Sequence, residues 1–119
     1  MKASDIAEAV HAKPLAIWNE SLLNKEYTAV FATDLMSDAL AMIQESPEDT
    51  VLVTGLCNAQ VLRTAEMLDI KLIIFARGKK LRQEDIDAAE GMDCNLFTTD
   101  YTLYETCGRL YSKGISAIS

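Results

Sequence analysis

The sequence predicts an α/β fold, a three-layer α/β/α sandwich around a mostly parallel or mixed sheet of about four to five strands. Short apolar runs alternate along the chain with segments whose apolar residues recur at helical spacing. Residues 50–80 contain two such runs, Val51–Val53 and Leu72–Phe75, joined by a helical segment that begins after Asn58. Two buried strands joined by a helix predict a parallel, right-handed βαβ unit. We expect residues 1–119 to form one domain around this unit.

The segment before this central unit predicts two strands and two helices. A first helix begins at Ser4, runs to about Ala12 and ends before Pro14, and a short strand follows at residues 15–18. Residues 27–33 predict a clearer strand. Asp34 then takes the place of an N-cap for a second helix. The predicted buried face of that helix is Met36, Ala39, Leu40 and Ile43.

The segment after the central unit predicts two helices and one strand. A helix from about residue 83 to residue 90 stops at Gly91, and residues 95–98 form the last strand. Asp100 begins the final helix, which ends at Gly114.

Composition and charge narrow the classes of partner. The chain has 119 residues, 50% of them hydrophobic and 24% charged, which is typical of a globular domain. Its net charge of -7 argues against nucleic acid or an anionic membrane as the main partner, because such surfaces attract a positive excess. Neither a long apolar stretch nor a leader pattern is present, so we expect a cytoplasmic protein.

The carboxyl ends of the central strands are the expected ligand-binding edge. They correspond to residues 54–58 and 76–80, and the second loop carries three basic side chains. Amides after Gly55 and at the following helix N-terminus can bind a phosphate or carboxylate. The predicted anion site consists of Thr54, Gly55, Asn58, Arg77, Gly78, Lys79 and Lys80. In the alternative interpretation the glycines only form turns, Asn58 is only a cap, and the basic side chains are solvated.

Cysteine and histidine give little support for catalysis. The three cysteines match no zinc or iron–sulfur spacing, so we predict no metal site, and Cys94 and Cys107 are expected to be buried apolar groups. Cys57 differs because it precedes a helix N-terminus, where a thiolate is favoured. His11 is the single histidine and is predicted to cap the first helix at its C-terminus. No Ser–His or Cys–His pair is therefore expected.

Acidic, aromatic and sulfur-containing side chains leave further alternatives open. Asp34 and Asp38 lie one helical turn apart, where they can bind a cation but more commonly act as a cap and a dipole partner; Asp100 is interpreted in the same way. The last helix carries three tyrosines that either form a partner surface or cover the sheet: Tyr101, Tyr104 and Tyr111. Four methionines are assigned to the core: Met36, Met42, Met67 and Met92.

Four segments together resemble the DRTGG domain family over nearly the whole chain: DLMSDALAMI from Asp34, TGLCNAQVLRTAEMLDI, FARGKK and TTDYTLYETCGRLYSKG. The resemblance implies a fold similar to the N-terminal domain of HPr kinase/phosphorylase. It also implies a regulatory or accessory role, because the domain occurs between the CBS domains of regulated pyrophosphatases. Where the family has paired glycines after the second central strand, this chain has Ala76, Arg77 and Gly78.

Two hypotheses for the function follow. The first is a non-enzymatic regulatory or accessory module that needs no cofactor, forms a homodimer, and binds a small anionic ligand (nucleotide or phosphate) or a protein partner. The second is a small redox or enzymatic accessory protein that uses an exposed, low-pKa Cys57. Small standalone members of the family are associated with iron-only hydrogenase systems, so the resemblance links this second hypothesis to an iron–sulfur hydrogenase system.

Overall fold

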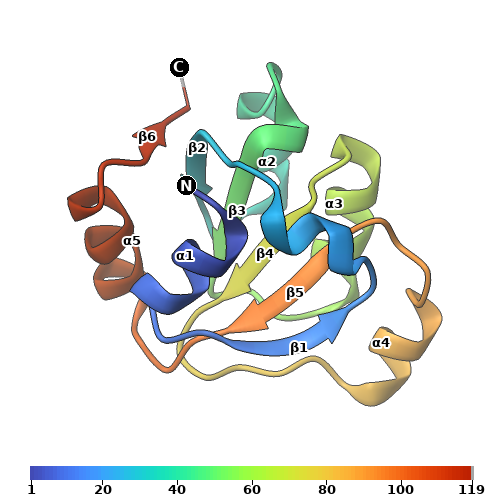
Figure 1. The fold of residues 1–119 in the computed structure, drawn as a ribbon. Coiled ribbons are helices and arrows are strands. Elements are labelled where there is room, and N and C mark those ends of the chain that lie inside the picture. Colours follow the sequence, from blue (N-terminus) through green and yellow to red (C-terminus); the bar gives the residue numbers. More distant parts are fainter. Residues whose placement is uncertain (119) are drawn as a thin grey trace.

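The computed structural model describes residues 1–118, which contain a six-stranded mixed sheet in the order β1-β5-β4-β3-β2-β6 (Figure 1). Strand β1 is antiparallel to β5, and the other neighbouring pairs are parallel. The strands are β1 (Lys13–Ile17), β2 (Ala29–Ala32), β3 (Thr50–Thr54), β4 (Leu72–Phe75), β5 (Asn95–Thr98) and β6 (Ser116–Ala117). The predicted α/β class is confirmed, and the sheet has one strand more than the upper end of the expected four to five. Strand β6 has two exposed residues and becomes a strand only by pairing with β2.

Helices cover both faces of this sheet and complete the three layers (Figure 1). Helices α2, α3 and α4 pack on one face, and α1 and α5 pack on the other. The helices are α1 (Ala3–Ala9), α2 (Met36–Met42), α3 (Ala59–Leu68), α4 (Gln83–Ala88) and α5 (Leu103–Ser112), with 3-10 turns η1 (Glu20–Asn24) and η2 (Pro47–Asp49). Within the described residues, each helix is too short or too polar to cross a membrane.

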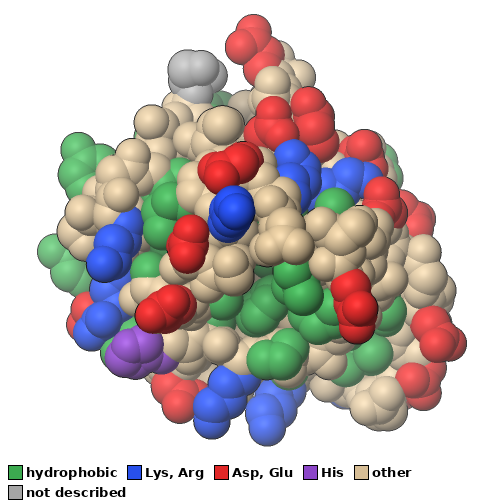
Figure 2. Space-filling view, in the orientation of Figure 1, with side chains coloured by type: hydrophobic (Ala, Val, Ile, Leu, Met, Phe, Trp, Pro, Cys, Tyr) green, Lys and Arg blue, Asp and Glu red, His purple; other side chains and the backbone are tan. Residues whose placement is uncertain are grey.

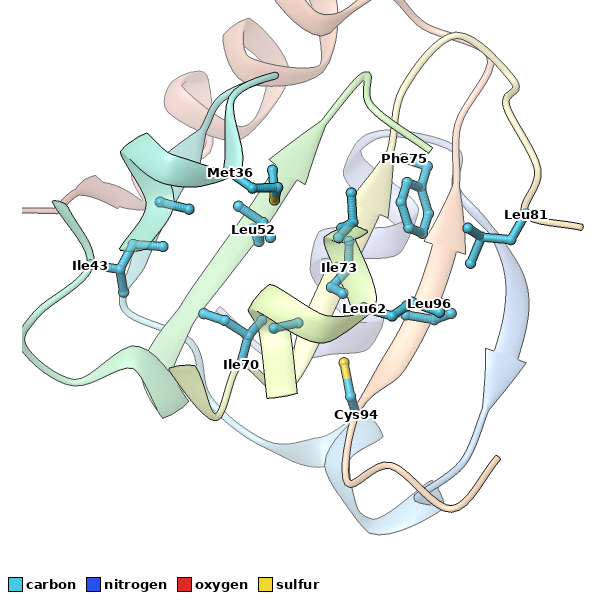
Figure 3. Close-up of a cluster of buried hydrophobic side chains, with 13 residues drawn as sticks. Met36, Ile43, Leu52, Leu62, Ile70, Ile73, Phe75, Leu81, Cys94 and Leu96 are labelled. Atoms are coloured by element: carbon cyan, nitrogen blue, oxygen red, sulfur yellow. The ribbon is translucent and has the colours of Figure 1, made fainter. Parts of the chain in front are cut away.

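Strands β3 and β4 are buried on both faces, which is why they appear as continuous apolar runs in the sequence. Leu52, Ile73 and Phe75 point to the layer of α2 and α3 (Figure 3), while their neighbours Val53 and Ile74 point to the layer of α1 and α5. Each of these side chains is at most 1% exposed. Full burial of such a side chain stabilises the fold by about 1.5–3 kcal/mol.

The start of α3 was predicted correctly from its capping residue. Asn58 caps α3, because its Oδ1 accepts from the amides of Gln60 (3.0 Å) and Val61 (3.4 Å). Ser4 does not begin α1, which starts at Ala3. Asp100 does not begin α5 either, since the Oγ1 of Thr102 caps that helix.

The first helix and first strand also differ from the prediction. Helix α1 ends at Ala9, and β1 starts at Lys13, so Pro14 lies inside a strand instead of between two elements. Because β1 is an edge strand, a residue without an amide proton is tolerated there. His11 has a left-handed backbone (φ 50°), and its Nδ1 lies 3.0 Å from the hydroxyl of Tyr101. Its side chain therefore contacts the loop before α5 and is not a helix cap.

The assignment of methionines to the core was wrong for two of the four. Met36 is 1% exposed and Met92 is partly buried against the core. Met42 and Met67 are 56% and 75% exposed, because they lie on the outer faces of α2 and α3.

Candidate ligand-binding site

The carboxyl ends of the parallel strands meet at one edge of the sheet, where the arrowheads of β3, β4 and β5 lie on the same side in Figure 1. Thr54 pairs in register with Phe75, and Phe75 pairs with Thr98. The loops that follow these three residues are therefore neighbours, as the βαβ prediction required. This edge holds most of the predicted site residues.

Asp34 occupies the backbone amide of Gly55, a residue of the predicted anion site. The Gly55 amide donates to Asp34 Oδ1 at 2.6 Å, a short hydrogen bond to a charged acceptor. Asp34 is therefore not the N-cap of α2. Leu35 occupies that position, and no side chain caps the helix with a hydrogen bond. The sequence could not reveal this contact, because it joins the ends of β2 and β3 across 21 residues.

Arg77 is fixed at this edge by its backbone. It has a left-handed φ of 64°, and its amide donates to the carbonyl of Tyr101 at 2.8 Å. The next amide, of Gly78, donates to the carbonyl of Thr99 at 2.6 Å. These bonds tie the loop after β4 to the loop after β5. They also show that the Gly78 amide is already satisfied and is not available to a ligand.

The side chains of Arg77 and Asp34 both approach Gly55. Arg77 Nη2 donates to the Gly55 carbonyl at 3.4 Å. A Cβ on residue 55 would lie 3.0 Å from Asp34 Oδ1 and 3.3 Å from Arg77 Nη2, so a glycine is needed for both groups to approach. A Cβ on Gly78 would similarly lie 2.8 Å from Asp100 Oδ1. The edge therefore presents both signs of charge.

The basic side chains of the loop after β4 are exposed and unpaired. Arg77, Lys79 and Lys80 have no carboxylate oxygen within 4.0 Å among residues 1–118. Thr54, in contrast, is buried, and its Oγ1 accepts from the Leu56 amide at 3.0 Å. Thr54 thus shapes the turn, and the three cations remain the groups that can attract an anion.

An open groove of about 390 Å³ lies at the N-terminus of α3. Asn58 and Cys57 line it together with two arginines that the sequence analysis did not select, Arg63 and Arg82. Arg82 pairs with Glu84 at 3.0 Å and with Asp85 at 3.2 Å. Arg63 lies on the first turns of α3. Its place five residues after the Asn58 cap could have indicated that it lines this groove, because long side chains on a helix point back toward the N-terminus.

Cys57 does not have the environment of a reactive thiol. Burial raises the pKa of Cys57, the positive charge of Lys79 opposes that rise, and Asp85 adds to it. The expected low pKa of this thiol is therefore contradicted.

The other two cysteines have no environment that favours a thiolate. Cys94 is fully buried, which raises its pKa to about 12, and burial also raises the pKa of Cys107. Among residues 1–118, no group of three or more histidine, cysteine or acidic side chains is arranged to bind a metal ion.

Comparisons with known proteins show a fold and leave the family open. No protein-family model matches the sequence, and no curated protein sequence is similar to it. The structure is similar to that of the CBS and DRTGG domains of the regulatory region of Clostridium perfringens pyrophosphatase, solved with the activator diadenosine tetraphosphate. The TM-score is 0.67 at 16% identity, over 92% of this chain and 45% of that chain. This similarity supports a DRTGG-like fold.

Proposed function

We propose that this protein is a non-enzymatic regulatory or accessory module that binds a small anionic ligand, a phosphate or nucleotide, at the carboxyl edge of its sheet. As a wider part of the proposal, the module is cytoplasmic and works as a homodimer. The observation that carries the ligand site is the contact between the basic loop after β4 and the turn before α3, where Arg77 Nη2 donates to the Gly55 carbonyl at 3.4 Å. A helix N-terminus and unpaired cations both attract anions.

The proposed ligand lies across the α3 groove, with its phosphate groups between Arg63 and the loop cations Arg77 and Lys79. A nucleotide suits this arrangement better than a monoanion, because the groove of about 390 Å³ is larger than one phosphate group requires. Asp34 competes with such a ligand for the Gly55 amide, because its carboxylate already accepts a hydrogen bond from that amide. Binding therefore either displaces Asp34 from this amide or uses the groove beside it.

The structural neighbour supports a regulatory role. It is the regulatory region of a pyrophosphatase, and it was solved with a nucleotide activator. The present chain spans 45% of that chain, so the proposal takes from it only a regulatory role and the class of ligand. The redox alternative lacks a supporting observation, because burial raises the pKa of the Cys57 thiol.

A thermal-shift screen tests the ligand site. The purified protein is heated with inorganic phosphate, mononucleotides and diadenosine tetraphosphate, and then the screen is repeated with Arg77→Ala and Lys79→Ala. A ligand present at one hundred times its dissociation constant stabilises the folded state by about 2.7 kcal/mol, which is a readily measured shift. We expect at least one phosphate ligand to stabilise the wild type, and both variants to lose most of this shift.

Lys113→Ala serves as the matched control, because it removes an exposed cation at the end of α5 and should leave the shift intact. An equal loss in this control would mean that only net charge matters, and the proposed site would be wrong. A wild type that no phosphate ligand stabilises would also overturn the proposal.

A further inference from the structure

The outer face of α5 is an exposed aromatic surface. Tyr104 and Tyr111 are 90% and 78% exposed, and Gly108 between them is exposed with open space around its Cβ position. Thr106 and Leu110 are buried, so the opposite side of the helix faces the sheet. Figure 2 shows hydrophobic side chains protruding where Figure 1 places α5. Exposed tyrosines of this kind are enriched at protein interfaces.

This aromatic surface continues into an apolar groove. The groove has a volume of about 420 Å³ and lies between α5 and the strands β2 and β6. Its apolar lining includes Val30, Ala32, Cys107 and the two exposed tyrosines. Helix α5 therefore covers this apolar part of the sheet incompletely, and the two tyrosines continue the apolar surface outward.

The charge on α5 differs from that of the whole chain. The protein carries a net charge of -7, whereas residues 103–113 contain one acid and two bases. Glu105 and Arg109 lie on the turn of α5 that contains Gly108, and they form an ion pair at 3.1 Å. A second copy of this acidic protein is therefore not repelled at α5, and an antiparallel copy would bring the acidic start of one helix to the basic end of the other.

We propose that α5 packs antiparallel against α5 of a second copy of this chain, around a two-fold axis that passes near Gly108. Tyr104 lies four residues before this glycine and Tyr111 lies three residues after it. The two-fold axis therefore places Tyr104 of each copy beside Tyr111 of the other, on the side of the groove. The absence of a side chain at Gly108 lets the two helices approach closely.

The same axis accounts for these two charged side chains. Glu105 of each copy lies close to Arg109 of the other, so two ion pairs form across the interface. This self-complementarity is what a two-fold interface requires, because the same surface must fit itself. The inference rests on the proposed function only for its expectation of a homodimer, and its surface contains none of the proposed ligand-binding residues.

Sedimentation equilibrium over a concentration series tests the aromatic part of the interface. We expect the wild type to form a dimer that dissociates on dilution, and Tyr104→Glu to raise the dissociation constant at least about tenfold. Met67→Glu is the matched control, because it places the same charge at an exposed apolar position of α3 and should leave the dimer unchanged. Circular dichroism verifies that each variant is folded.

A charge exchange tests the orientation. Glu105→Arg and Arg109→Glu each place like charges across the proposed axis, so each variant alone should dissociate more readily. Mixed in equal amounts, the two variants should form a heterodimer with two restored ion pairs, and this dimer should be tighter than either variant alone. A mixture that associates no better than its components would overturn the antiparallel arrangement.

The remaining outcomes also decide the inference. A wild type that is monomeric at every concentration contradicts it, and so does a dimer that tolerates both Tyr104→Glu and the charge variants. The thermal-shift screen separates the two proposals. A monomeric Tyr104→Glu that still responds to phosphate ligands leaves the ligand site intact, whereas a normal dimer without any ligand response contradicts only the ligand site.

Discussion

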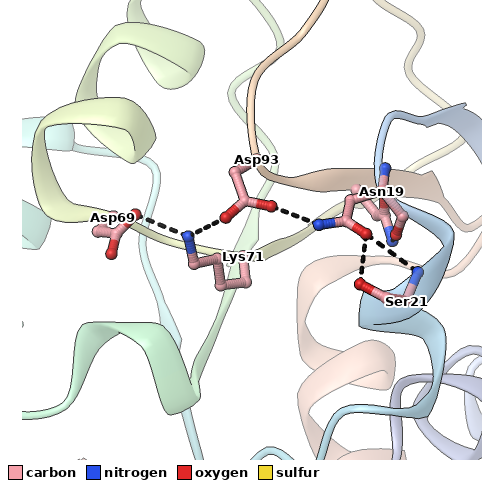
Figure 4. A network of polar contacts seen from close by, with 6 residues as sticks. Asn19, Ser21, Asp69, Lys71 and Asp93 are labelled. Carbon is pink, nitrogen blue, oxygen red and sulfur yellow. Dashed lines mark hydrogen bonds and ion pairs between the residues drawn. The ribbon is translucent and has the colours of Figure 1, made fainter.

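The two ends of the sheet carry similar side chains and use them in opposite ways. At the amino ends of β4 and β5, Lys71 Nζ contacts Asp69 at 2.8 Å and Asp93 at 2.7 Å (Figure 4). Asp93 also accepts from the side-chain amide of Asn19 at 2.6 Å, which connects the end of β1 to this network. At the carboxyl ends, the cations Arg77 and Lys79 have no carboxylate oxygen within 4.0 Å among residues 1–118.

This difference separates charges that hold the fold together from charges that can bind a ligand. The Lys71 side chain is only 12% exposed, so its charge is satisfied inside the protein. Partial burial acts to lower the pKa of Lys71, but hydrogen bonds with Asp69 and Asp93 raise it overall. The unpaired cations of the carboxyl end keep their attraction for an external anion. Single substitutions at the two ends of the sheet test this division.

Asn95→Ala should be the most destabilising of these changes. Asn95 is 1% exposed, its Nδ2 donates to the Asn19 carbonyl at 2.9 Å, and its Oδ1 accepts from the Asn19 amide at 3.0 Å. Removing both bonds leaves backbone groups without partners and should lower the free energy of unfolding by about 2 kcal/mol. Urea denaturation measures the loss.

Asn58→Ala at the carboxyl end is the comparison for Asn95→Ala. It removes the exposed cap of α3 and should cost about 1 kcal/mol. A larger loss for Asn58→Ala than for Asn95→Ala would show that the amino end is not the more tightly held end of the sheet.

Gly78→Ala should destabilise the carboxyl end by about 1–2 kcal/mol, because residue 78 has a left-handed φ of 67°. The new Cβ also lies 2.8 Å from Asp100 Oδ1. The double variant Gly78→Ala/Asp100→Ala removes that contact but keeps the backbone strain. Thermal unfolding should therefore show only partial recovery in the double variant. Full recovery would mean that the contact with Asp100, and not the backbone, requires glycine.

Asp34→Asn should strengthen the binding of a phosphate ligand about threefold, which corresponds to roughly 0.7 kcal/mol. The substitution removes a negative charge beside Arg77 but keeps an oxygen that can accept from the Gly55 amide. Isothermal titration with the ligand identified in the screen measures the change. Asp38→Asn, on the exposed surface of α2, is the control and should bind like the wild type. Weaker binding by Asp34→Asn would mean that the carboxylate supports the ligand.

Asp93→Asn should have the smallest effect and a clear dependence on pH. The hydrogen bond from Lys71, followed by that from Asn19, lowers the pKa of Asp93. A lowered pKa contributes stability that is fully present above the unfolded-state pKa of about 3.9 and is lost as the pH falls through the lower folded-state value.

Because Asp93 is exposed, the Asp93→Asn variant should lose less than about 1 kcal/mol near neutral pH. The difference from the wild type should shrink in acid and in high salt. Urea denaturation at several pH values measures it. A difference that grows in acid would contradict the assigned role of this ion pair.

Local patterns allowed the core of this fold to be predicted from sequence. The runs Val51–Val53 and Leu72–Phe75 are apolar at every position, so they had to be buried on both faces whatever the rest of the chain does. Asn58 was recognised as a cap because its side chain bonds to amides only two and three residues away. The positions of Gly55 and Gly78 after buried strands likewise indicated the edge where their loops lie.

The amino-acid sequence by itself thus determined the fold class, the two central strands and the edge at which the basic loop lies, because these depend on apolar periodicity and on contacts within a few residues. Only the tertiary structure decided that Asp34 takes the Gly55 amide, that Arg63 lines the groove and that β6 joins β2. These features depend on the order and register of the strands. Strand order brings together residues that are distant in the sequence, and local pattern carries no information about which of them meet.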